Sequence, residues 1–190
     1  MSYQKEIQRE ARVDSEAPAS IKQSKLDRVF INIAKEVAAL SYCKRAKVGA
    51  VIVKGGNIVS FGYNGMPKGM ENCCERTVYM PPDAGGWLDP EQVEKQWPHR
   101  DDVGRYDYET KREVLHAESN AILKAAKFGQ SLKGSTLYLT MSPCIDCAKL
   151  ILQSGIKRVV YYELFKRDNG SVEFLKNFVK LEQFSDEDVP

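Results

Sequence analysis

The residues best suited to chemistry stand in two short motifs of this 190-residue chain. His116 and Glu118 form the first, and Cys144 and Cys147 follow Pro143 in the second. Cysteines three residues apart project from one face of a helix, and a helix N-terminus favours the thiolate over the thiol. Together with the histidine they offer three strong ligands to a tetrahedral zinc ion, which leaves one position for water. Three protein ligands plus water are typical of a catalytic rather than a structural zinc site.

Glu118 supplies a carboxylate two residues from the histidine. In a regular helix, residues i and i+2 point about 200° apart, so both can face one site only if His116 lies at the N-cap or in the first turn. Two thiolates weaken the acidifying effect of zinc on water, so a base is needed to complete the deprotonation. We therefore predict that Glu118 is the catalytic acid and base. The arrangement H-x-E followed by P-C-x-x-C is the signature of zinc deaminases, which hydrolyse the amidine group of a nucleobase.

Other interpretations of the cysteine pair fit the sequence less well. A zinc ribbon needs a second pair with matching spacing, but Cys73 and Cys74 are adjacent. A thioredoxin-like redox pair does not need a His-x-Glu motif at a second helix start. A non-catalytic zinc module that binds a partner has no use for Glu118.

Both motifs open predicted helices in an alternating strand–helix pattern. Strands that alternate with helices imply parallel crossovers, and a β-hairpin around Gly55-Gly56 adds an antiparallel pair, so the sheet is predicted to be mixed with helices on both sides. A long, irregular insertion at about 75–112 lies between the halves, and loops of that length are usually functional. The expected helices span 24–43, 116–127, 144–153 and 171–177, and the expected strands span 48–53, 57–61, 136–140, 158–162 and 179–183.

Composition excludes several classes of protein. The chain carries 28 basic and 26 acidic side chains, whereas nucleic-acid-binding domains are usually strongly basic. No apolar run approaches the ~18 residues that span a membrane, and no secretion signal precedes the helices, so we expect a soluble, cytoplasmic protein. Five cysteines, an odd number, argue against a disulfide framework. We expect one catalytic domain at 25–184, between an N-terminal tail or arm at 1–24 and an acidic tail at 185–190.

Four stretches of the chain resemble the deoxycytidylate (dCMP) deaminase family: 48–52, the Gly-Tyr-Asn-Gly-Met-Pro loop at 62–69, 116–122 and 142–156. The resemblance covers most of residues 26–183. It implies a three-layer α/β/α cytidine-deaminase-like fold with a mixed central sheet of about five strands. It also implies conversion of dCMP to dUMP, a homohexamer, activation by dCTP and inhibition by dTTP, with Mg²⁺ on the triphosphate.

The same resemblance assigns roles to residues around the zinc ion. It implies that Asn64 contacts the deoxyribose, that the Ala117 backbone N–H holds the cytosine carbonyl, and that the Ser142 carbonyl accepts from the departing amino group. Phe165 stands where the family places an aromatic ring near the base, although a ring at this position could equally belong to the core or the surface.

The substrate phosphate needs cations, and strand-end loops are where α/β sheets bind ligands. From the two loops with suitable charge we predict that Lys47 and Arg167 contact the substrate, and a solvated charged loop is the alternative for each. The cations of these loops are Lys44, Arg45, Lys47, Lys166 and Arg167.

For the effector nucleotide, we predict a phosphate-binding loop at Gly65, Lys68 and Gly69, because glycine lets backbone N–H groups approach an anion. Asn120 is a further candidate. The alternative is that these glycines only shape a turn.

A second, structural zinc is a separate hypothesis. Some phage-type members of the family hold one with cysteines at the positions of Cys43 and Cys73, but Tyr106 and Val114 replace the remaining ligands here. His99 or Cys74 could substitute, and the alternative is a set of buried or idle thiols.

A zinc deaminase of another nucleoside or nucleotide is one competing function, and the other is a zinc deaminase that acts on the bases of RNA or single-stranded DNA. Such proteins need a basic, aromatic-lined groove to hold a strand. The balanced charge and the nucleotide-type loop at 62–69 argue against it, so we expect no nucleic-acid partner.

Overall fold

A computed structural model describes residues 21–80, 86–96, 105–165 and 170–188. Most of the predicted N-terminal tail, together with His99 and Arg167, lies outside the described residues. The helices are α2 (Ile21–Ala39), α3 (Pro90–Gln96), α4 (Ala117–Lys127), α5 (Ile145–Gln153), α6 (Ser171–Lys176) and the 3-10 helix η1 (Asp186–Asp188). The strands are β1 (Gly49–Lys54), β2 (Asn57–Tyr63), β3 (Glu75–Met80), β4 (Arg105–Thr110), β5 (Thr136–Met141), β6 (Arg158–Glu163) and β7 (Lys180–Gln183).

Five strands form the central sheet in the order β2-β1-β5-β6-β7. Strand β1 pairs antiparallel with both β2 and β5, whereas β5, β6 and β7 run parallel. The parallel part follows from the crossover helices α5 and α6, since parallel neighbours cannot be joined by a tight turn. The predicted mixed sheet of about five strands is confirmed.

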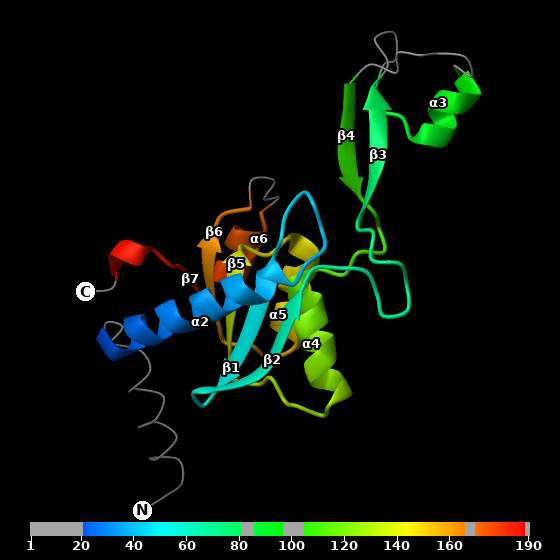
Figure 1. The fold of residues 1–190 in the computed structure, drawn as a ribbon. Coiled ribbons are helices and arrows are strands. Elements are labelled where there is room, and N and C mark those ends of the chain that lie inside the picture. The colour runs from blue at the N-terminus through cyan, green and yellow to red at the C-terminus, as the bar shows by residue number, and fades with distance from the viewer. Residues whose placement is uncertain (1–20, 81–85, 97–104, 166–169, 189–190) are drawn as a thin grey trace, which may run out of the picture.

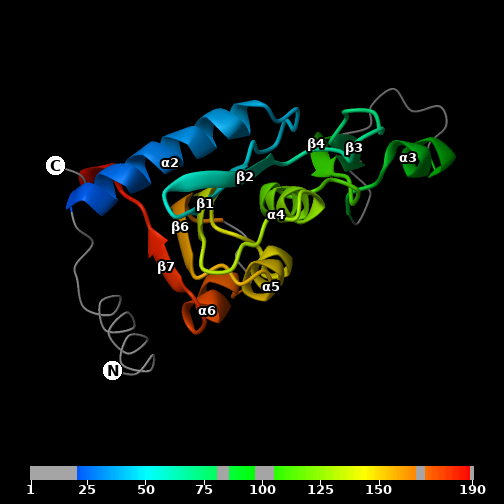
Figure 2. The same cartoon turned by 90° about the horizontal axis from the view of Figure 1, so that it is seen from below.

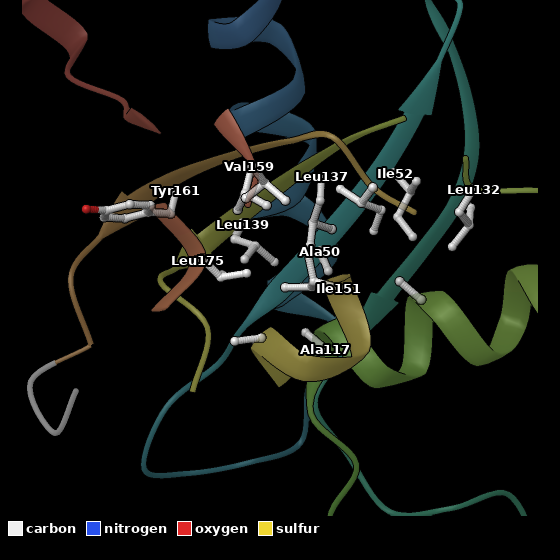
Figure 3. Close-up of a cluster of buried hydrophobic side chains, with 14 of the residues drawn as sticks. Ala50, Ile52, Ala117, Leu132, Leu137, Leu139, Ile151, Val159, Tyr161 and Leu175 are labelled. Atoms are coloured by element: carbon white, nitrogen blue, oxygen red, sulfur yellow. The ribbon is translucent and has the colours of Figure 1, made fainter. Parts of the chain in front are cut away.

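Helices cover both faces of this sheet (Figures 1 and 2). Alternate residues of β1 face opposite layers: Val51 and Val53 pack toward α2, and Ala50 and Ile52 pack toward α4 and α5. Figure 3 shows side chains of the sheet gathered over Ile151 of α5 and the start of α4. Because both faces are buried, the central strands read as nearly continuous apolar runs.

Two glycines let helices approach the sheet closely. A Cβ atom at Gly49 would overlap the backbone of Ala34 in α2, and one at Gly62 would overlap the backbone of Ala117 in α4. Neither position tolerates a side chain without moving a helix. Glycine at position 62 therefore fixes how closely the start of α4 approaches β2.

The segment at 75–112, predicted as an irregular insertion, contains regular structure. Strands β3 and β4 form a two-stranded antiparallel ribbon that projects from the body and carries α3 (Figure 1). The exposed Arg76 and Glu109 form an ion pair across it, and Val78 and Val93 are buried within it. We call β3, α3 and β4 the arm. Its residues beyond these few are largely polar, which explains why the sequence pattern did not reveal the strands.

The helix predicted to start at Ser24 begins earlier, at Ile21. The acidic C-terminal segment is attached to the body, because Asp186 accepts hydrogen bonds from Arg28 and Tyr162. Across the described residues, every helix is too short or too polar to span a bilayer.

Candidate metal centre and active-site pocket

His116 lies at the N-cap of α4 with an extended backbone (φ −73°, ψ 156°). Its side chain therefore does not follow the helical spacing that would turn it away from Glu118. Its Nδ1 atom lies 3.4 Å from Cys144 Sγ and 3.4 Å from Cys147 Sγ. The predicted convergence at a helix start is confirmed, and the ring nitrogen that faces the sulfurs is Nδ1.

The cysteines occupy the start of α5 in the same manner. Cys144 is the N-cap residue, with φ −77° and ψ 171°, and Cys147 lies in the first turn. The helix predicted to begin at Cys144 thus begins one residue later, and Pro143 precedes the cap. The cysteine motif directly follows β5, whereas the His-x-Glu motif follows β4, and the starts of α4 and α5 meet so that the two motifs come together.

The three ligand atoms suit zinc. A tetrahedral zinc ion with usual bond lengths holds sulfur and nitrogen ligand atoms about 3.6 Å apart, close to the two separations in this structure. One nitrogen and two sulfurs form the type of donor set that zinc prefers. Within the described ranges, His116, Cys144 and Cys147 are the only such group of three potential ligands.

The three candidate ligands shift one another's pKa values. Hydrogen bonds from Cys147 and His116 lower the pKa of Cys144 to about 4, although burial opposes this. The hydrogen bond to Cys144 also raises the pKa of His116, and together with burial it raises the pKa of Cys147. The Cys144 thiolate thus lies between two proton donors, His116 and Cys147. Both would lose a proton when a divalent cation binds, because metal ligands must be deprotonated.

Glu118 lies beside this centre. It is only 4% exposed, and burial raises the pKa of its carboxyl group to about 7. The neighbouring Cys147 thiol acts against burial and lowers the pKa of this carboxyl group in part. A buried carboxyl with such a pKa can both accept and release a proton near neutral pH, which suits a general acid and base.

The centre opens into a pocket of about 520 Å³, within the size range of small-molecule sites. All four substrate residues that the family resemblance placed around the metal line this pocket, but Lys47 does not. Three polar lining residues are not apparent from the sequence: Glu75, Thr110 and Glu163. Glu75 and Thr110 come from the arm, which lies far from the metal motifs in the chain, and Glu163 ends β6. The pocket is lined by Cys43, Arg45, Ala46, Val48, Asn64, Glu75, Thr110, Val114, His116, Ala117, Glu118, Met141, Ser142, Cys144, Glu163, Leu164 and Phe165.

Asn64 braces the loop that precedes β1. Its Oδ1 atom accepts from the Val48 N–H at 2.8 Å, and its Nδ2 atom donates to the Ala46 carbonyl at 2.9 Å. An amide side chain has two donors and two acceptor positions, so one of each lies beyond these two bonds. The side chain can therefore hold the loop and still contact a ligand.

Ser142 and Phe165 are linked in the opposite wall of the pocket. The Ser142 hydroxyl accepts a hydrogen bond from the Phe165 N–H at 2.8 Å, and its own backbone N–H donates to Glu163. The hydroxyl thereby fixes the backbone that carries the aromatic ring. Phe165 is one of the residues that line the pocket, and its contact with the base stays a prediction.

The residues predicted to bind an effector do not line this pocket. Gly65 exchanges two backbone hydrogen bonds with Leu115, and the Asn120 side chain donates to the Tyr63 carbonyl. Lys68 is exposed, and Gly69 has φ of 95°, so the loop does need glycine for its shape. An effector site at these residues stays a prediction.

Among the described residues, the three candidate cysteines of a second zinc do not form a group of metal ligands. Cys43 and Cys74 form a disulfide, and Cys73 is exposed and donates to the Glu75 carbonyl. His99 lies outside the described residues. The disulfide joins the loop after α2 to the base of the arm, so one pair of cysteines is bridged, although the sequence argued against a disulfide framework.

A family model described as the cytidine and deoxycytidylate deaminase zinc-binding region matches residues 24–163. The deoxycytidylate deaminase of Enterobacteria phage T4 is 40% identical over 166 residues, which cover 77% of this chain and 83% of the phage protein. That of Mycobacterium phage D29 is 38% identical over 138 residues, covering 71% of this chain and 92% of the relative.

The fold is also similar to a solved structure. The dCMP deaminase of cyanophage S-TIM5, in complex with dCMP and dUMP, aligns with a TM-score of 0.63 and 33% identity. The alignment covers 84% of this chain and 96% of the cyanophage chain. The described core therefore has an architecture similar to that of the cyanophage chain.

Proposed function

The chain belongs to the cytidine and deoxycytidylate deaminase family and is a deaminase, and on this basis we propose that it hydrolyses dCMP to dUMP and ammonia. The observation that carries the proposal is a cluster of three zinc-type ligands, two of which, His116 and Cys144, line one pocket together with the buried Glu118. Water supplies the new oxygen, and the 4-amino group leaves with the protons needed to form ammonia.

His116, Cys144 and Cys147 would hold the zinc ion. When bound, the ion supplies Lewis-acid activation of water. Glu118 would take one proton from the attacking water and deliver it to the ring nitrogen, and would then take the remaining proton of that water from the new hydroxyl group and pass it to the amine, which leaves as ammonia. Its pKa of about 7 matches this two-way role, because both protonation states are populated near neutral pH.

The walls of the pocket supply the contacts that orient the base. The Ala117 N–H lies in the first turn of α4, where backbone donors have no partner within the helix, and it would donate to the cytosine carbonyl. The Ser142 carbonyl would accept from the amino group, Phe165 would lie beside the base, and Asn64 would contact the deoxyribose. Their common position around the pocket supports these roles.

A turnover assay tests the proposal. The zinc-loaded protein is offered dCMP, cytidine and a cytosine-containing oligonucleotide, and release of ammonia is measured. We expect the highest kcat/KM with dCMP. Preference for the oligonucleotide would instead support a nucleic-acid deaminase.

We further propose that dCTP activates and dTTP inhibits the enzyme, with Mg²⁺ on the triphosphate, and that the protein assembles as a homohexamer. The exposed Lys68 provides a cation for phosphate and Gly69 beside it is exposed, whereas Gly65 holds the loop against Leu115 through two backbone hydrogen bonds, and Asn120 lies on α4. Sedimentation with and without each triphosphate measures the assembly state.

A further inference from the structure

The cysteine motif of the metal centre begins outside its helix. Cys144 is the N-cap of α5 and has an extended backbone, and its carbonyl accepts the first helical bond from the Ala148 N–H at 2.9 Å. The carbonyl of Pro143 precedes the N-cap, so it lies outside the hydrogen-bond ladder of the helix. Because Pro143 is buried, this oxygen needs a donor from another part of the chain.

Ser171 supplies that donor. Its side chain is fully buried, and its hydroxyl donates to the Pro143 carbonyl at 2.6 Å. Ser171 belongs to α6, whereas the three candidate metal ligands belong to α4 and α5 and their N-caps. The hydrogen bond thus connects the cysteine motif to a third helix that contributes no ligand of its own.

The hydroxyl is held by a well-packed element. Ser171 is the first residue of α6, and Leu175, one turn later, belongs to the same buried cluster as Ala148 and Ile151 of α5. Figure 3 shows Leu175 and Ile151 within this cluster. The two helices therefore pack against each other, and the Ser171 hydrogen bond joins their N-terminal ends.

The bond acts on Cys144 through a planar peptide unit. The atoms from Pro143 Cα to Cys144 Cα lie close to one plane, so a restraint on the Pro143 oxygen also restrains the position of Cys144 Cα. The residue before Pro143 is held as well, because the Ser142 N–H donates to the Glu163 carbonyl at 2.8 Å. Cys144 itself has no side-chain cap bond, so the position of its sulfur depends on the backbone that delivers it.

We propose that Ser171 is a positioning residue of the metal centre. By orienting the Pro143–Cys144 peptide, it holds Cys144 Sγ at the separation from His116 that a zinc ion requires. The inference rests on the proposed function, because it concerns the same centre. Residues that orient a metal ligand typically contribute 10- to 100-fold to metal affinity or activity, although they do not touch the ion.

The test measures the zinc affinity of the full chain by competition with a chromogenic chelator. It compares the wild type with Ser171→Ala and Ser135→Ala. Ser135 is the matched control: its hydroxyl is similarly buried and donates to the Leu132 carbonyl at 2.7 Å, but it precedes β5, whereas the cysteine motif follows that strand. We expect Ser171→Ala to weaken zinc binding by roughly 10-fold and Ser135→Ala to bind zinc as the wild type does.

Urea unfolding with and without zinc separates positioning from a general loss of stability. A variant that only destabilises the fold loses the same free energy of unfolding in both conditions. Ser171→Ala should in addition lose about 1.4 kcal/mol of the stabilisation that zinc provides, which corresponds to a tenfold weaker affinity. Ser135→Ala should keep the full zinc-dependent stabilisation.

Two results would overturn the inference: wild-type zinc affinity in Ser171→Ala, or an equal loss of zinc affinity in both variants. Ammonia release from dCMP, measured on the same wild-type sample, tests the proposed function separately. A wild type that binds zinc but does not deaminate dCMP would contradict that function, while the zinc affinities would still decide the role of Ser171. A wild type that binds no zinc would contradict both.

Discussion

A Cβ atom at Gly62 in β2 would come within 2.5 Å of the Ala121 nitrogen in α4. Two hydrogen bonds reinforce this contact: the Ser60 hydroxyl donates to the Ala121 carbonyl at 2.7 Å, and the Asn120 side chain donates to the Tyr63 carbonyl at 3.0 Å. The helix that begins at the metal-binding histidine is therefore fastened directly to the edge strand of the sheet.

This contact predicts the effect of Gly62→Ala. The added methyl group must displace backbone, not a flexible side chain, so we expect a loss of about 1–3 kcal/mol in the free energy of unfolding. Urea unfolding measures it, and zinc content should fall as α4 moves. Gly86→Ala, where a Cβ atom meets nothing within 4 Å, is the control. Equal stability of the two variants would show that the close approach is unimportant.

Replacement of the buried carboxyl group separates catalysis from metal binding. We expect Glu118→Gln to retain zinc and thermal stability, because the side chain keeps its shape and is not one of the three ligands. Turnover should fall roughly 100- to 10,000-fold, the usual contribution of a positioned acid and base. Steady-state kinetics and metal analysis on the same sample measure both properties. Substantial remaining activity would remove Glu118 from the proton transfers.

A buried ion pair on the opposite side of the sheet predicts acid sensitivity. Asp27 accepts from two guanidinium nitrogens of Arg158, at 2.7 and 2.8 Å, and from the Tyr138 hydroxyl. Burial alone would raise the pKa of Asp27, but these hydrogen bonds outweigh it and lower the pKa below its ordinary value. The unfolded chain then binds the proton more readily, so the contribution to stability is present above about pH 4 and disappears as the pH falls through the folded-state pKa.

Asp27→Asn should reduce this acid dependence. At neutral pH we expect it to cost about 3 kcal/mol, because it removes one partner of a buried pair. The exposed pair of Glu173 and Lys176 offers a control, and Glu173→Gln should change stability little. Thermal unfolding from pH 3 to pH 7 compares the three proteins. A wild-type acid profile in Asp27→Asn would contradict the assignment.

Regulation by triphosphates predicts a phenotype for Lys68→Ala. Removing this exposed cation should weaken the change in dCMP affinity that dTTP and dCTP each produce, since both effectors present phosphate. The measurement is the KM for dCMP at increasing effector concentration, with Lys54→Ala as the matched loss of a surface charge. An unaltered effector response would place the regulatory site away from the 62–69 loop.

The sequence reveals the metal centre because its chemistry depends on residue type and short spacing. His116, Cys144 and Cys147 are recognisable as ligands, and the i, i+2 argument requires the N-cap position that His116 takes. The crossover topology follows in the same way from alternating strands and helices.

The sequence does not reveal the contacts between segments that lie far apart in the chain. The arm is hard to predict because β3 shows no regular alternation of apolar and polar residues, and the alternating tyrosines of β4 stand within a segment rich in charge, proline and glycine. That Arg45 lines the pocket while Lys47 does not depends on where the loop before β1 is held, and its contacts with Glu75 and Thr110 come from distant segments. The Cys43–Cys74 disulfide likewise depends on how the arm meets the loop after α2.

We conclude that His116, Cys144 and Cys147 hold one zinc ion and leave its fourth coordination position to water. Anomalous diffraction across the zinc absorption edge tests it most directly, with crystals grown from protein that has not been treated with chelator. The account predicts one peak per chain in this pocket, about 2.0–2.3 Å from His116 Nδ1, Cys144 Sγ and Cys147 Sγ, with no fourth protein ligand. A pocket without a peak, or an ion closed off by a fourth side chain, would contradict it.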